Sequence, residues 1–100
     1  MYSPYMSAPC PVLGFVIRVV LHDSATDSDT DAVVDDLMAF LENHGLVGAG
    51  DGARTLQFVV HRDGTQADEN DRQMVREWSR RWTTNATIDV GPLTDLNPAV

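Results

Sequence analysis

The sequence predicts an α+β fold of two layers, in which two helices cover one face of a four-stranded sheet. Three segments alternate apolar and polar residues with the period of a strand, and two others repeat apolar residues with the period of a helix. Glycine, aspartate or proline stands at the changes of period. With a short further strand at 46–47 the order is β-α-β-β-α-β, which predicts a ferredoxin-like, split β-α-β sandwich.

The first half of the chain predicts one strand and one helix. In residues 13–22 every second side chain is apolar, and the side chains between them are partly polar. This is the pattern of a strand with one fully apolar face. In the polar stretch that follows, Asp27 or Ser28 is expected to cap a helix. Apolar side chains then recur at helical spacing over 32–44. Gly45 is expected to end this helix in the left-handed conformation.

The middle of the chain predicts a hairpin. Residues 46–47 form a short edge strand, and the glycine-rich segment 48–52 is predicted as a flexible turn. Residues 54–62 alternate again and return as a strand. The short second strand leaves an open sheet edge, through which two copies of the chain could pair as a homodimer.

A second helix and a last strand complete the predicted fold. Asp68 and Asp71 form an acidic capping pattern that opens a helix running to about residue 82. Residues 85–93 alternate once more and predict the last strand. The apolar stripe of the second helix consists of Met74, Val75, Trp78 and Trp82.

The connections predict which strands lie at the sheet centre. Each helix follows a long strand, so right-handed crossovers predict strands 13–22 and 54–62 as parallel central neighbours. Their apolar faces, with Phe15 and Phe58, are expected to meet the helices. RNA-recognition modules of this topology stack bases on exposed aromatic residues, and the predicted open face has none. That open face carries Val16, Arg18, Val20, His22, Gln57, Val59, His61 and Asp89.

Length and composition indicate one globular domain. The chain has 100 residues, of which 43% are hydrophobic and 22% charged. We divide it into a flexible leader (1–12), a single α+β domain (13–93) and a C-terminal tail (94–100). The leader contains Cys10, the only cysteine, which is expected to be a structurally idle thiol. The apolar run 12–21 is too short to cross a bilayer, and a cytoplasmic location is expected.

The charge balance narrows the class of partner. Seven basic residues against fifteen acidic ones give a net charge of −8, which argues against DNA or another phosphate backbone as a direct partner. All seven basic residues are arginine. Genomic composition bias and adaptation to high salt both account for this, and the stability of the purified protein against salt would separate them.

No residue pattern forms a catalytic site. No serine or cysteine has a paired base, and the segment 48–52 lacks the lysine of a phosphate loop, so neither an enzyme nor a cofactor is expected. Asp27, Asp29 and Asp31 imitate the start of a calcium loop without its glycine and glutamate, and are interpreted as helix-entry acids. His44 is expected to interact with the end of the first helix.

Two histidines are weak candidates for a metal site. In the predicted parallel arrangement His22 and His61 lie at the same end of adjacent strands, with Asp23 and Asp63 close by. The simpler interpretation is a pair of surface histidines beside turn acids, and we expect no bound metal.

The second helix carries a basic ridge, which we define as Arg72, Arg76 and Arg80. These arginines recur every four residues on an otherwise acidic protein. They are interpreted either as a solvated face supported by intrahelical pairs such as Glu69 with Arg72, or as a partner-binding strip. The planar guanidinium would suit an acidic protein surface or a few phosphates.

Five short motifs, in order over about 13–97, together resemble a known family, the YggL-like proteins once called DUF469. The resemblance implies a small, non-catalytic bacterial protein that associates with the large (50S) ribosomal subunit, in its assembly or regulation. The motifs are Leu13-Gly14-Phe15, Val34-Asp35-Asp36-Leu37, Gly50-Asp51-Gly52, Val75-Arg76-Glu77-Trp78 and Leu93-Thr94-Asp95.

Two segments depart from the family pattern. The start MYSPYMSAPCP is not rich in Lys or Arg, and the strand after the glycines has Leu56-Gln57-Phe58 where the family has Trp-Glu-Gly. A basic arm would be the natural contact with rRNA, and without it an acidic domain is expected to dock on the basic faces of ribosomal proteins. The alternative function is a ferredoxin-like module, monomeric or dimeric, that binds a small ligand or a protein.

Overall fold

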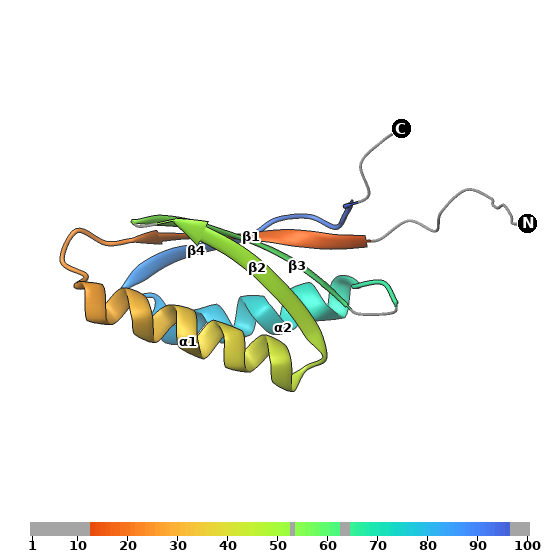
Figure 1. The fold of residues 1–100 in the computed structure, drawn as a ribbon, viewed down its shortest axis with the longest axis horizontal. Coiled ribbons are helices and arrows are strands. Elements are labelled where there is room, and N and C mark those ends of the chain that lie inside the picture. The colour runs from red at the N-terminus through yellow and green to blue at the C-terminus, as the bar shows by residue number, and fades with distance from the viewer. Residues whose placement is uncertain (1–12, 53, 63–64, 97–100) are drawn as a thin grey trace, which may run out of the picture.

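The computed structural model describes residues 13–52, 54–62 and 65–96, so the predicted leader and Cys10 lie outside the described residues. The two helices lie on the same side of one sheet, which confirms the predicted two-layer α+β fold (Figure 1). The elements are β1 (Leu13–Leu21), α1 (Asp27–Asn43), β2 (Leu46–Gly52), β3 (Thr55–Arg62), α2 (Glu69–Ser79), the 3-10 turn η1 (Arg80–Trp82), β4 (Ala86–Val90) and β5 (Thr94–Asp95).

The sheet has the strand order β2-β3-β1-β4, and every pair in it is antiparallel. The prediction that β1 and β3 are central neighbours is confirmed, but the prediction that they run parallel is wrong. Each helix connects two strands of like direction, β1 to β2 and β3 to β4. Because the hairpin between β2 and β3 reverses the chain, β3 runs against β1.

The last strand is shorter than predicted. β4 covers Ala86–Val90, and the chain then continues to β5, whose two residues pair with the start of β1. Thr94 lies opposite Gly14, and Asp95 lies opposite Leu13. The first residues of the predicted tail are thus joined to the sheet.

The apolar faces of β1 and β3 meet the helices as predicted. Phe15 is 0% exposed and Phe58 is 3% exposed, and Trp78 of α2 is 3% exposed between the layers. Burial of such side chains, at about 2 kcal/mol each, is the main force that holds the helices on the sheet. The largest fully buried hydrophobic residues are Phe15, Ile17, Leu37, Leu41, Val19, Val33, Val60 and Val75.

The glycine-rich segment after α1 is a strand, so its prediction as a flexible turn is wrong. β2 continues through Gly48 and Gly50 to Gly52, which lies opposite Leu56 of β3. A Cβ atom at Gly50 would overlap the carbonyl oxygen of Gln57, and Gly52 has a φ of +137°. Glycine is needed here for the close approach of two strands as well as for the bend.

Both helix starts use a capping box, in which two residues exchange backbone-to-side-chain hydrogen bonds. α1 is capped by Thr26, one residue before the predicted Asp27 or Ser28, and its partner is Asp29. Asp68 and Asp71 cap α2 as predicted. Gly45 has a φ of +71° and follows the end of α1, which confirms its left-handed conformation. In the described part of the chain, no helix is long and apolar enough to cross a membrane.

Candidate docking surfaces

The two candidate metal-binding histidines lie at opposite ends of β1, so their expected juxtaposition is wrong. His61 pairs with Gly14, near the first residue of β1, whereas His22 follows the last one. The antiparallel direction of β3 is the reason. His22 also has partners for both ring nitrogens, with Nδ1 3.1 Å from the Thr84 carbonyl oxygen and Nε2 3.3 Å from the Thr87 hydroxyl. Among residues 13–52, 54–62 and 65–96, no group of three or more metal-ligating side chains gathers.

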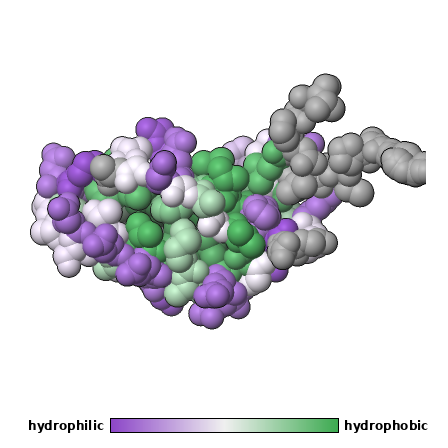
Figure 2. Space-filling model, in the orientation of Figure 1, coloured by the Kyte–Doolittle hydropathy of each residue, from purple (hydrophilic) through white to green (hydrophobic). Residues whose placement is uncertain are grey.

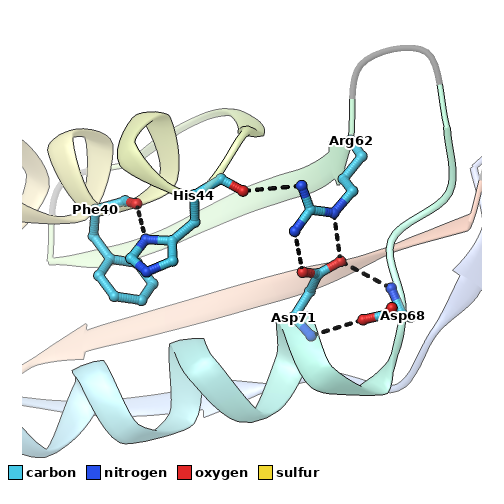
Figure 3. Close-up of polar contacts among 5 residues, drawn as sticks. All are labelled: Phe40, His44, Arg62, Asp68 and Asp71. Atoms are coloured by element: carbon cyan, nitrogen blue, oxygen red, sulfur yellow. Dashed lines mark hydrogen bonds and ion pairs between the residues drawn. The ribbon is translucent and has the colours of Figure 1, made fainter.

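An ion pair between the half-buried Arg62 and the buried Asp71 joins the end of β3 to the start of α2 and the end of α1 (Figure 3). Asp71 is 1% exposed, and Arg62 binds both of its carboxylate oxygens, with Nε 2.9 Å and Nη2 2.5 Å away. The third nitrogen of Arg62 donates to the carbonyl oxygen of His44 at 2.9 Å. One guanidinium therefore fixes three chain segments relative to each other.

The environment of Asp71 keeps it charged. Burial has the largest effect and raises its pKa, but the hydrogen bonds and charge of Arg62 and the capping bonds of Asp68 together outweigh it. The pKa of Asp71 is therefore lowered from the usual 3.8. Because Arg62 and Asp71 bond to each other and to groups of neighbouring elements, this cluster is a structural joint.

A second carboxylate, Asp36, holds the two helices together. Its Oδ2 accepts hydrogen bonds from the indole Nε1 of Trp78 at 2.8 Å and of Trp82 at 2.9 Å, and Arg81 lies 3.6 Å away. Burial raises the pKa of Asp36, but the bonds from the two indoles and the charge of Arg81 outweigh it, so the pKa is lowered from 3.8.

The structure divides the basic ridge into one fixed and two free arginines. Arg72 pairs with Glu69, as expected, and also donates to the carbonyl oxygens of Gly91 at 2.6 Å and Val90 at 3.2 Å. Its guanidinium is thus held against the end of β4. Arg76 and Arg80 are exposed, and their guanidinium groups bond to no other described residue.

Arg76 and Arg80 line a hollow beside the outer edge of β4, which we name the β4 groove. The groove has a volume of about 350 Å³ and is mostly polar. Because the rest of the chain is acidic, two free guanidinium groups make it a local site for negative charge. Its lining residues are Arg76, Ser79, Arg80, Ile88, Asp89 and Val90.

The opposite charge gathers on α1. This helix contains six acidic residues and no basic one in its 17 residues. Figure 2 shows hydrophilic residues along α1, beside an apolar area in the middle of the same face. We name the exposed carboxylates of this helix the acidic α1 face, which consists of Asp27, Asp31, Asp35 and Glu42.

The open face of the sheet carries no exposed aromatic residue among those described. The aromatic side chains of β1 and β3, Phe15 and Phe58, both point inward. Val59 is 42% exposed on the open face, and Arg18 is exposed between Gln57 and Asp89. This surface therefore offers no base-stacking platform of the kind found in RNA-recognition modules.

A second hollow, of about 270 Å³, opens between the two helices. His44 contributes to it, with its ring 4.2 Å from the ring of Phe40 and its Nδ1 2.8 Å from the Phe40 carbonyl oxygen. That bond satisfies a carbonyl in the last turn of α1, in line with the interaction expected for His44. The hollow is lined by Phe40, His44, Met74, Glu77, Trp78 and Arg81.

Sequence reasoning missed three features of these surfaces. Asp36 does not belong to the apolar spacing of its helix, and its tryptophan partners lie 42 and 46 residues away. Arg62 is the last residue of a predicted strand, and its bonds to Asp71 and His44 had no signal in the sequence. The third feature is the open edge of β4, which depends on the order of the strands in the sheet. Helical and strand periodicity carries no signal for such long-range contacts.

The sequence model of the family described as YggL 50S ribosome-binding protein matches residues 11–97. No curated protein and no solved structure matches the chain.

Proposed function

Because the chain belongs to the YggL 50S ribosome-binding protein family, we propose that it associates with the 50S ribosomal subunit as a non-catalytic accessory protein, in subunit assembly or regulation. The match to residues 11–97 is the observation that carries this proposal. The partner implies a cytoplasmic protein. The description of the family names binding and no chemical reaction, which fits a chain without a catalytic residue pattern.

The acidic α1 face is the proposed contact. A net charge of −8 disfavours rRNA, whereas the basic surfaces of ribosomal proteins attract a row of free carboxylates. Asp31 and Asp35 lie one helical turn apart, and Glu42 extends the same helix toward its end. All three are exposed, so their contribution to folding is small and they are available to a partner.

Co-sedimentation with purified 50S subunits tests both parts of this proposal. The wild-type protein is expected to pellet with the subunits at low salt and to dissociate as salt is raised. The variant D31N/D35N/E42Q, which keeps side-chain shape and removes charge, is expected to lose this binding. A failure of the wild-type protein to pellet at low salt would contradict 50S association.

A matched variant distinguishes the two charged surfaces. R76A/R80A alters exposed residues of the β4 groove and is expected to pellet like the wild type. If R76A/R80A lost binding and the acidic variant kept it, the contact would be the arginine surface, and the acidic α1 face would be wrong.

A second candidate function is that of a protein-binding module on the same scaffold, which the β4 groove favours. Homodimer formation through the edge strand β2 is a related prediction, because no described strand pairs with the outer edge of β2. Light scattering coupled to size-exclusion chromatography measures the mass of the particle and would detect such a dimer.

A further inference from the structure

The outer edge of β4 is open for backbone pairing. β4 stands last in the strand order, and no described strand pairs with its outer side. The N–H of Gly91 donates to the Val16 carbonyl oxygen at 2.8 Å, on the side of β1. Because alternate residues of a strand point their N–H and C=O groups the same way, those of Ile88 and Val90 face outward.

Arg72 covers one end of this edge and leaves the middle free. Its guanidinium donates to the carbonyl oxygens of Val90 and Gly91. The backbone N–H and C=O of Ile88 remain at the edge, beside the β4 groove. Such an edge pairs readily with an added strand.

The groove provides contacts for side chains as well as for a backbone. The side chains of Ile88 and Val90 pack against the core, on the helix side of the sheet. A strand added beside β4 would point every second side chain toward that same side. There it would meet the exposed guanidinium groups of Arg76 and Arg80.

We propose that the β4 groove binds an extended acidic peptide segment, which adds to the sheet as a strand beside β4. Its backbone pairs with Ile88, and its helix-facing carboxylates pair with Arg76 and Arg80. Asp89 also lines the groove, but strand alternation directs its side chain to the opposite face of the sheet, where it is paired in register with Arg18. This binding is independent of 50S association through the acidic α1 face.

The charge and shape of the groove favour a peptide over nucleic acid. Each outward-facing residue of a strand edge presents an N–H donor and a C=O acceptor. The backbone of another peptide can bond to both groups. A phosphate backbone has acceptors only. The described groove lining also lacks an aromatic residue on which a base could stack.

Fluorescence anisotropy with a defined probe tests the proposal. The probe is a labelled, capped heptapeptide in which glutamate and threonine alternate. The wild-type protein is expected to bind it, and R76A/R80A is expected to bind about tenfold more weakly through loss of charge-assisted hydrogen bonds. The control is R81A, which removes one positive charge outside the groove and is expected to leave the affinity unchanged.

A change in the probe tests strand addition without altering the protein. Only every second peptide N–H can face β4, so N-methylation of one alternating set is expected to abolish binding. N-methylation of the other set is expected to leave binding intact. Equal affinity of the two methylated peptides, or of a peptide with glutamine in place of glutamate, would overturn the proposal. So would binding of a single-stranded RNA oligonucleotide where the heptapeptide does not bind.

Discussion

The indole nitrogen of Trp78 donates to the carboxylate of Asp36 at 2.8 Å, which joins α2 to α1. Trp82 donates to the same oxygen atom at 2.9 Å. The two helices follow different strands and reach each other only on the surface of the sheet. One carboxylate thus fixes the relative position of two elements that no local sequence pattern connects.

Loss of this carboxylate should destabilise the fold. Asp36→Ala leaves two indole N–H groups without their acceptor, and Trp78 is almost fully buried. We expect the free energy of unfolding to fall by about 2 kcal/mol, as measured by urea denaturation. The control is Asp35→Ala, one position away and exposed, with an expected change below about 0.5 kcal/mol. Equal losses in the two variants would contradict the role of Asp36.

The ion pair of Arg62 with Asp71 should contribute more than the surface pair of Arg72 with Glu69. Arg62→Met leaves the buried carboxylate of Asp71 without its cation, which should cost about 3 kcal/mol in urea denaturation. Glu69→Ala removes a side chain that is 69% exposed and should cost less than about 1 kcal/mol.

A double variant distinguishes the contribution of the ion pair from the cost of an unpaired Asp71 carboxylate. Adding Asp71→Asn to Arg62→Met removes the unpaired charge and should recover part of the lost stability. If Arg62→Met cost no more than Glu69→Ala, the buried pair would not be the joint between β3 and α2.

The fold could be predicted from the sequence because its elements are strongly periodic. Phe15 and Phe58 lie on apolar faces that alternate with polar ones, and this alternation correctly assigned the buried side of both central strands. The direction of β3 was predicted wrongly. Periodicity reports which face is buried, and it carries no information on whether two neighbouring strands run parallel or antiparallel.

The candidate surfaces were only partly predictable. Regular spacing identified Arg72, Arg76 and Arg80, but it could not distinguish the fixed Arg72 from the two free arginines, because the partners of Arg72 include carbonyl oxygens at the end of β4. The predicted juxtaposition of His22 and His61 assumed that the two central strands run parallel. It is wrong because these strands are antiparallel.

The contribution of Asp71 to stability should depend on pH. Its folded pKa is lowered from 3.8, so its contribution is complete above that value and is lost as the pH falls through the folded pKa. The difference in free energy of unfolding between wild type and Asp71→Asn should therefore be larger at pH 7 than at about pH 3. Charge repulsion among the other carboxylates changes with pH in both proteins and largely cancels in this difference. A difference that stays constant with pH would contradict the lowered pKa.

Two glycines of β2 should respond differently to the same substitution. In Gly50→Ala the new Cβ meets the backbone carbonyl of Gln57, which cannot move without breaking the strand pairing, so we expect a loss of about 2–4 kcal/mol. In Gly48→Ala the nearest atom is Cδ1 of Leu41 at 2.6 Å, the end of a side chain that can rotate, and the loss should be smaller. Urea denaturation of both variants measures the difference. A turn of loosely held glycines would tolerate both substitutions alike, whereas a paired strand must distinguish them.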